Sequence, residues 1–295
     1  MSLKISVGIV GFGIMGQGIA LVAAVSGCSL VIKSHDYKKL LDQRDIFSVA
    51  LKKHLKRNPE LEIDAEKALE NIRFIDGYEG FSDCDLIIEA VNEDIQIKAE
   101  IFKSISLVVP DTTVIASNTS SLSITKLSGF IAHPQNFIGI HFMNPVSTMP
   151  LVEIVRGFST SDSTFEKSIA FVESISKKHI VAKDFPGFAL NRILIPMINE
   201  AIFALYEGIG TASDIDEALK LGANHPMGPL ALADLIGLDT CLSIMKILAS
   251  GFGDSKYRPC PLLVRYVECG WLGRKTNKGF YDYKIVGRPA TWPLE

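Results

Sequence analysis

The chain has 295 residues, of which 47% are hydrophobic and 21% charged, a composition typical of a folded globular protein long enough for two domains. Its formal net charge of −3 argues against a nucleic-acid partner, because there is no basic excess to displace counterions from a phosphate backbone. Without a signal-peptide pattern, a bilayer-length apolar run or paired cysteines, the sequence predicts a cytoplasmic protein with reduced thiols, no membrane contact and no metal site.

A glycine motif stands near the start of the chain. A β-branched apolar run leads into Gly-Phe-Gly-Ile-Met-Gly, and an Ala-, Val- and Leu-rich segment follows, which is the pattern of a strand, a tight turn and a helix. Gly11 lets the chain turn sharply, Gly13 lets bare backbone approach a pyrophosphate, and Gly16 lets the helix pack closely. This context favours a dinucleotide site over a purely structural turn. The predicted site comprises Gly11, Gly13, Ile14, Met15 and Gly16 at a helix N-terminus.

The second predicted strand covers residues 29–32, and the side chain just after it decides which dinucleotide is accepted. A carboxylate there accepts a hydrogen bond from the ribose 2′-OH and repels a 2′-phosphate. Counting from the glycines, Asp36 is the candidate carboxylate, whereas the position directly after the strand holds Ser34. With Ser34 in that role, the neighbouring Lys33 and Lys38 favour a phosphate instead. Both NAD and NADP therefore stay open as cofactors.

Strands and helices alternate through the first half of the chain, which predicts an α/β fold with a Rossmann-like, doubly wound sheet. The spacing of apolar residues predicts helices over 37–57 and 95–109, a short helix from Asp64, and strands at 72–75, 86–90, 114–116, 137–142 and 152–155. Ligands of such sheets bind beyond the carboxyl ends of the strands. Two loops expected at that edge contain Glu93, Lys98 and the segment 117–121.

The composition changes at Pro186-Gly187, and the remaining sequence is helical with capped breaks. We therefore place the domain boundary near Asp184. The predicted domains are a dinucleotide-binding domain over residues 1–184 and an all-α domain over residues 185–295, which we expect to serve substrate binding and dimerisation.

Among the six histidines, His141 has a distinctive position, because it ends an apolar strand, IGIH, at the edge where a cofactor would bind. Histidine is the side chain best suited to move a proton at neutral pH. Glu153 lies on the next predicted strand, within LVEIV, and a carboxylate in such surroundings needs a partner such as an imidazole N–H. A lone histidine would be a structural residue. The pair, in a dinucleotide fold, favours general acid/base catalysis of hydride transfer.

Further motifs follow one another over nearly the whole chain: GFGIMGQGIA, IASNTSSLSIT, IGIHFMNPV, LVEIVRG, DFPGFALNRILIPMINEA, LGANHPMGP and GWLGRKTNKGFYDY. Together they strongly resemble the 3-hydroxyacyl-CoA dehydrogenase family, and most closely its short-chain bacterial members that act on 3-hydroxybutyryl-CoA. The resemblance implies interconversion of (S)-3-hydroxybutyryl-CoA and acetoacetyl-CoA with a nicotinamide cofactor. It also implies a homodimer formed through the C-terminal domain.

The resemblance further implies roles for individual residues. His141 and Glu153 match the family's catalytic pair, and Ser120 and Asn191 match residues that hold the substrate's C3 oxygen and thioester region. Positions associated with the cofactor fall on Glu93, Lys98, Ser120, Asn144 and Lys275. Contacts with CoA phosphates fall near the basic end of the helix over 37–57, at Ser48 and Lys56.

One departure from the family pattern concerns the cofactor. Members that use NAD usually carry Asp directly after the second strand, where this chain has Ser34, so NADP stays open while Asp36 keeps NAD open. Two other functions are compatible with parts of the sequence. The segments SNTSSL and LGANHPMGP are also compatible with sugar-acid dehydrogenases of the gulonate type, which belong to the same superfamily. A non-catalytic dinucleotide-binding or structural protein would retain the fold, but the presence of both His141 and Glu153 argues against it.

Overall fold

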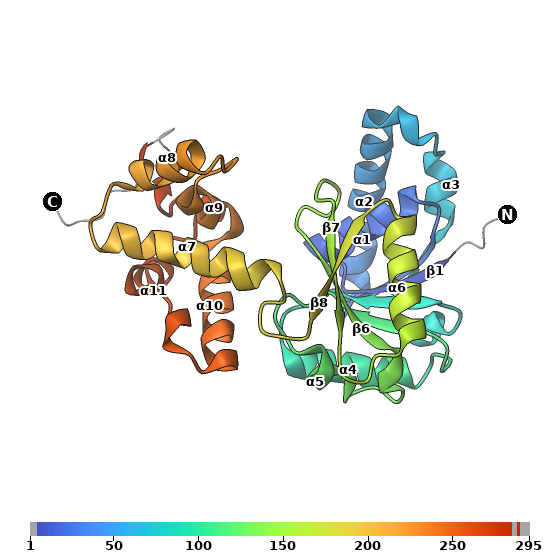
Figure 1. Cartoon of the computed structure of the whole chain (residues 1–295). Coiled ribbons are helices and arrows are strands. Elements are labelled where there is room, and N and C mark those ends of the chain that lie inside the picture. Colours follow the sequence, from blue (N-terminus) through green and yellow to red (C-terminus); the bar gives the residue numbers. More distant parts are fainter. Residues whose placement is uncertain (1–4, 285–287, 290–295) are drawn as a thin grey trace. The chain divides into compact units, whose positions relative to one another are not determined.

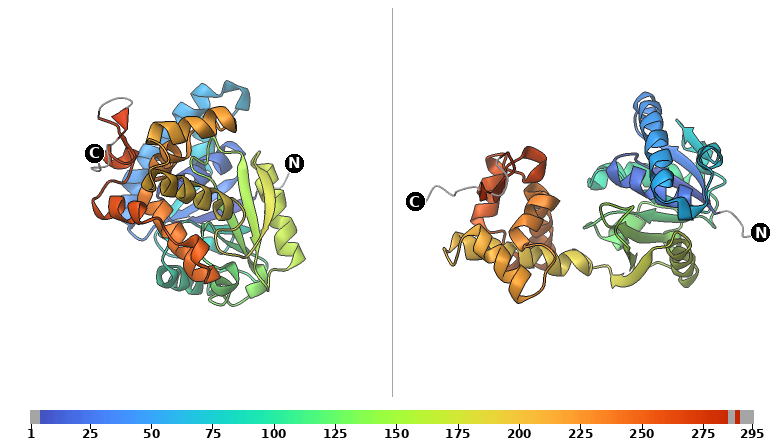
Figure 2. Two further views of the ribbon diagram at one scale, coloured as in Figure 1. Left: turned by 60° about the vertical axis from the view of Figure 1, so that its left-hand side comes forward. Right: turned by 90° about the horizontal axis from the view of Figure 1, so that it is seen from above.

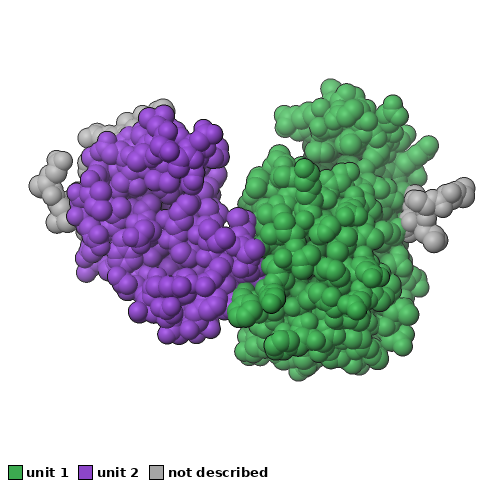
Figure 3. All heavy atoms as spheres, in the orientation of Figure 1, with its two compact units in different colours: residues 1–185 green, residues 186–295 purple. Residues whose placement is uncertain are grey.

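The computed structural model describes residues 5–284 and 288–289. The chain divides into two compact units, residues 1–185 and residues 186–295, which are coloured separately in Figure 3. The sequence analysis placed the boundary near Asp184. The division reflects contacts within each unit. The roles expected of the two domains stay predictions.

The first unit contains a sheet of eight strands in the order β3-β2-β1-β4-β5-β6-β7-β8. All neighbouring strands are parallel except β6 and β7, which are antiparallel. The described strands are β1 Ser6–Val10, β2 Ser29–Lys33, β3 Ile72–Ile75, β4 Leu86–Glu89, β5 Val114–Ser117, β6 Phe137–Phe142, β7 Leu151–Arg156 and β8 Lys178–Lys183. This order, in which the chain crosses over on either side of β1, confirms the predicted doubly wound fold.

Helices cover both faces of this sheet, as Figure 1 shows. The described helices of the unit are α1 Ile14–Val25, α2 Tyr37–Arg57, α3 Ala65–Glu70, α4 Ile95–Ser106, α5 Ile124–Ser128 and α6 Asp162–Ser174, with 3-10 turns at Pro59–Leu61, Glu79–Phe81 and Pro134–Asn136. Apolar side chains of α1, α2, α3 and α6 pack in one core with the strands. On the other face, Phe102 of α4 meets Phe137 of β6 edge-on, with ring centroids 4.9 Å apart.

Three details differ from the sequence analysis. The helix expected to reach residue 109 ends at Ser106, where turns lead to Pro110. Strand β8 and helix α6 were not predicted. The β8 sequence, KHIVAK, is mostly exposed and lacks alternation, because this strand lies at the sheet edge.

The second unit is a helical domain, which confirms that prediction, and Figure 2 shows it from two further sides. Its described helices are α7 Leu190–Tyr206, α8 Ala212–Gly222, α9 Pro229–Ile236, α10 Leu238–Phe252 and α11 Pro261–Glu268, with 3-10 turns at Ser255–Tyr257 and Arg274–Thr276. It also contains two short strands, β9 Tyr281–Asp282 and β10 Arg288–Pro289, which pair antiparallel. Of the helices in the described ranges, none combines the length and apolar character needed to cross a membrane.

Candidate functional site

The glycine turn between β1 and α1 is closely packed at Gly11 and Gly16 and open at Gly13. Gly11 has φ +99°, and a Cβ there would lie 2.6 Å from the carbonyl oxygen of Ala90. A Cβ at Gly16 would lie 1.9 Å from the carbonyl oxygen of Gly11, so the helix crosses the turn too closely for any side chain. A Cβ at Gly13, by contrast, would meet nothing within 4 Å, and no side chain caps α1. An exposed backbone before an uncapped helix N-terminus fits a pyrophosphate.

The end of β2 lies beside this turn. The Gly11 N–H donates a hydrogen bond to the Lys33 carbonyl oxygen at 2.8 Å. Ser34 follows β2 directly, whereas the Asp36 carboxylate accepts a hydrogen bond from the Lys39 N–H at 2.9 Å and caps α2.

His141 and Glu153 face each other across the antiparallel pair β6 and β7. The imidazole Nδ1 lies 2.8 Å from Glu153 Oε2, so the predicted contact is present. His141 is 6% exposed and Glu153 is fully buried. The neighbouring backbone is also fixed, because the Phe142 N–H donates to Asn118 Oδ1 at 2.8 Å. An ionised Glu153 can only accept a hydrogen bond, so this contact requires a hydrogen on His141 Nδ1.

A second group of charges lies at the ends of β4 and β5, and we call Glu89, Glu93, Lys98 and Ser117 the Glu–Lys cluster. The Lys98 ammonium is 2.6 Å from Glu89 Oε1 and 3.3 Å from Glu93 Oε2. Glu89 is fully buried and Lys98 is 1% exposed. Ser117 donates to the other Glu89 oxygen at 2.6 Å. In this structure Lys98, which was expected to contact the cofactor, is an internal counterion.

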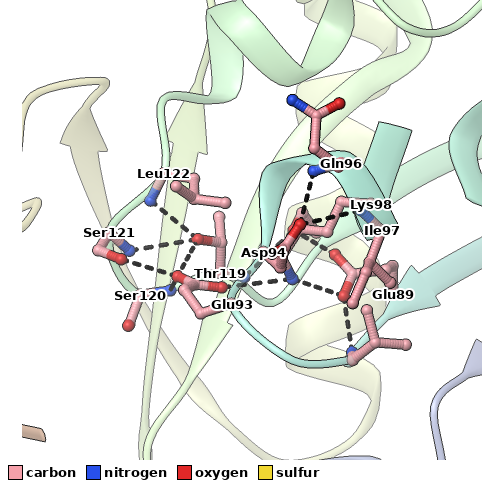
Figure 4. Close-up of polar contacts among 12 residues, drawn as sticks. Glu89, Glu93, Asp94, Gln96, Ile97, Lys98, Thr119, Ser120, Ser121 and Leu122 are labelled. Carbon is pink, nitrogen blue, oxygen red and sulfur yellow. Dashed lines mark hydrogen bonds and ion pairs between the residues drawn. The ribbon is translucent and has the colours of Figure 1, made fainter. Parts of the chain in front are cut away.

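Glu93 joins this cluster to the loop after β5, as Figure 4 shows. Its Oε1 accepts hydrogen bonds from the Ser120 N–H at 3.0 Å, from the Ser121 hydroxyl at 2.8 Å and from the Thr119 hydroxyl. Burial alone would raise the pKa of Glu93, but the Lys98 charge and these hydroxyl donors lower it below its usual value. An ionised Glu93 therefore holds the Ser120 backbone, while the Ser120 hydroxyl turns away (Figure 4).

The other predicted site residues lie in several places. Asn144 is exposed after β6, and Lys56 is exposed in the last turn of α2. Ser48, also on α2, donates to the Arg44 carbonyl oxygen at 3.0 Å. Asn191 and Lys275 belong to the second unit. Asn191 is 9% exposed on α7. The Lys275 ammonium is paired with Asp239.

Two buried aspartates of the second unit were not singled out by the sequence analysis. Asp216 accepts hydrogen bonds from the Leu230 and Ala231 N–H groups at 2.7 and 3.0 Å, and so caps α9. Asp234 accepts from the N–H groups of Phe280 and Tyr281 at 3.0 and 2.9 Å, and from the Tyr283 hydroxyl at 3.0 Å. Burial raises the pKa of Asp234 to about 6, and the nearby Asp216 charge acts in the same direction.

Glu89 was also missed, although the sequence carries a signal for it. It ends the apolar run LIIE just as His141 ends IGIH, and an ionisable side chain in that position needs a partner.

Comparison with known proteins gives consistent matches along the chain. Residues 6–185 match the 3-hydroxyacyl-CoA dehydrogenase NAD binding domain, and residues 187–283 match the C-terminal domain of the same family. A 3-hydroxybutyryl-CoA dehydrogenase of Bradyrhizobium diazoefficiens is 51% identical over 94% of this chain and 95% of its own. The human mitochondrial hydroxyacyl-coenzyme A dehydrogenase is 36% identical over 94% of this chain and 90% of its own. The crystal structure of (S)-3-hydroxybutyryl-CoA dehydrogenase from Ralstonia eutropha superposes with a TM-score of 0.91 at 44% identity, covering 95% of this chain and 99% of that one.

Proposed function

Because this chain belongs to the 3-hydroxyacyl-CoA dehydrogenase family, we propose that it interconverts (S)-3-hydroxybutyryl-CoA and acetoacetyl-CoA with NAD as the hydride carrier. The observation that carries the proposal is the buried His141–Glu153 pair, which lies at the sheet edge that also holds the glycine turn. The full-length similarity to 3-hydroxybutyryl-CoA dehydrogenases supports the substrate.

The pair suits proton transfer at the substrate's C3 oxygen. When bound, the nicotinamide supplies or accepts the hydride. With Glu153 ionised, the His141 Nδ1–H donates to it, which fixes the orientation of the ring and leaves Nε2 for the substrate oxygen. In the oxidation, His141 Nε2 takes the 3-hydroxyl proton, and in the reduction the imidazolium returns it to the ketone oxygen. General acid/base catalysis of this kind contributes about 10²- to 10⁴-fold to a rate.

The remaining roles in the proposal rest on the resemblance. Ser120 and Asn191 are the proposed substrate ligands, and the hydrogen bond from the Ser120 N–H to Glu93 supports a fixed position for Ser120. CoA contacts at Ser48 and Lys56, and a homodimer formed through the second unit, belong to the same proposal.

The direct test is reduction of acetoacetyl-CoA by NADH, followed through the absorbance of the reduced nicotinamide. Turnover with acetoacetyl-CoA and none with L-gulonate in the reverse assay is the expected result. Turnover with L-gulonate and none with any acyl-CoA would instead place the chain with the sugar-acid dehydrogenases. A folded protein that binds NADH and turns over neither substrate would be a non-catalytic relative.

A further inference from the structure

The position that reads the adenosine ribose is fixed by the contact between the glycine turn and β2. The Gly11 N–H donates to the Lys33 carbonyl oxygen at 2.8 Å, and Val10 pairs with Lys33 in the sheet. Ser34 is therefore the first residue past the strand at the carboxyl edge, next to the turn. In a dinucleotide site of this type, the residue at the end of the second strand meets the ribose 2′ position.

Ser34 brings no charge to that position. Its side chain is half-buried, and its hydroxyl has no hydrogen-bond partner within residues 5–284 and 288–289. A serine hydroxyl both donates and accepts, so it can bond to a ribose 2′-OH or to a phosphate oxygen.

The nearest carboxylate in the sequence serves α2 instead. Asp36 lies two residues further on, is exposed, and accepts the Lys39 N–H at 2.9 Å as the helix N-cap. This hydrogen bond holds the carboxylate at the start of α2. The N-cap hydrogen bond stabilises α2, so it opposes movement of Asp36 toward a ribose.

The charge next to Ser34 is positive. Lys33 is 8% exposed, and its ammonium contacts the carbonyl oxygens of Asp76 at 2.5 Å and Ser34 at 3.4 Å. It also lies 4.7 Å from the centre of the Tyr78 ring. Among the described residues it has no carboxylate partner, so its charge is not neutralised locally. His35 and Lys38, both exposed, follow within four residues of Ser34.

We propose that Ser34 determines coenzyme choice in this protein and makes the site permissive, so that NADPH is accepted as well as NADH. The inference rests on the proposed function and adds a specificity residue to it. Without a carboxylate after β2, a 2′-phosphate meets the Ser34 hydroxyl and the Lys33 charge in place of a repulsive group. We expect the dissociation constants of NADH and NADPH to agree within about tenfold, a difference of about 1.4 kcal/mol.

Isothermal titration of NADH and NADPH into the full chain tests the proposal without any catalytic readout. Ser34→Asp is expected to weaken NADPH binding at least about thirtyfold relative to NADH, since it restores the repulsive carboxylate. Asp36→Asn is the matched control, because asparagine is an equally good N-cap. We expect it to change the ratio of the two constants by less than about threefold, well below the tenfold step that corresponds to 1.4 kcal/mol.

Two results would overturn the assignment. The first is a wild-type protein that binds NADPH more than about a hundredfold more weakly than NADH. The second is a switch of the ratio by Asp36→Asn and not by Ser34→Asp, which would make Asp36 the discriminating carboxylate. An absence of acetoacetyl-CoA turnover with either coenzyme would contradict the proposed function alone, because the ratio of binding constants reports on Ser34 independently.

Discussion

The first unit buries Glu89 beside a lysine. In the second unit, the partners of the buried Asp216 and Asp234 among residues 186–284 are backbone N–H groups and tyrosine hydroxyls. Removing a carboxylate from water is costly in both places. The lysine offsets that cost with an opposite charge, because its ammonium lies 2.6 Å from Glu89 Oε1. The aspartates have no cation among these partners, and the cost appears as a pKa of about 6 for Asp234.

The two arrangements hold different segments of the chain in place. The Glu–Lys cluster connects the end of β4 to the loop that carries Ser120, so it holds a proposed substrate-binding segment in place. Asp234 instead fastens the segment over 279–283 onto α9. A Cβ at Gly279 would lie 1.9 Å from Asp234 Oδ1, which shows how closely that segment approaches the carboxylate. We therefore expect the first arrangement to depend on its counterion and the second to depend on pH.

Removal of the counterion has the largest expected effect on stability. Lys98→Met leaves Glu89 buried without a cation and should lower the free energy of unfolding of the first unit by about 3–5 kcal/mol. Hydrogen exchange of the amides in β4 and β5 measures this loss of stability locally. Lys103→Met, on an exposed position of the same helix, is the control and should cost less than about 0.5 kcal/mol. Equal losses in the two variants would contradict the view that the buried charge matters.

Asp234→Asn should change how the stability of the second unit depends on pH. The pKa of Asp234 is about 6 in the folded protein, against a usual value of 3.8. Between these two pH values the folded state therefore binds more protons than the unfolded state. The stability contributed by Asp234 therefore falls as pH rises from about 4 to about 6. Relative to Asp234→Asn, the wild type should lose about 2–3 kcal/mol over that range.

Tryptophan fluorescence reports this unfolding, because residues 1–185 of the sequence contain no tryptophan and Trp271 packs against Tyr266 in the second unit. A wild type that gains stability relative to the variant as pH rises would show that the carboxylate, not the acid, is the favoured form.

Glu93→Gln should give a smaller effect of opposite sign. The pKa of Glu93 is lowered in the folded protein, so its contribution to stability is present above its usual value and is lost as pH falls through the lower folded value. The Glu93 side chain is 33% exposed, so solvent screening reduces the effect relative to Asp234. Hydrogen exchange of the Ser120 amide, compared between wild type and variant at each pH, measures this effect. A pH-independent difference would mean that Glu93 acts without its charge.

Much of the first unit was predictable because its strands are continuous apolar runs separated by helical spacing and glycine turns. The antiparallel direction of β7 was not predicted, although the loop from Met143 to Pro150 is shorter than the roughly twelve residues that a parallel crossover needs. The exposed edge strand β8 lacks the apolar character by which the inner strands were recognised. A hydrophobic pattern in the sequence indicates burial, and an edge strand such as β8 buries few of its side chains.

The candidate site was predictable where an ionisable residue ended an apolar run, as for His141. The same rule applies to Glu89. Its partner nine residues later, Lys98, was assigned to the cofactor from the family resemblance, and sequence alone does not show where a long side chain ends. Asp216 and Asp234 were missed for another reason. Their partners are backbone N–H groups, which leave no mark in the sequence, and the hydroxyls of tyrosines 49 or more residues away.

The proposed reaction depends most on His141, the residue proposed to exchange a proton with the substrate oxygen. The most direct measurement is kcat for acetoacetyl-CoA reduction by the His141→Gln variant, with NADH binding measured alongside to show that the protein is folded. We predict a fall in kcat of about 10³-fold while the NADH dissociation constant changes little. A folded variant that binds NADH and retains kcat within about tenfold of the wild type would contradict the account, because such a small loss lies below the range of general acid/base catalysis.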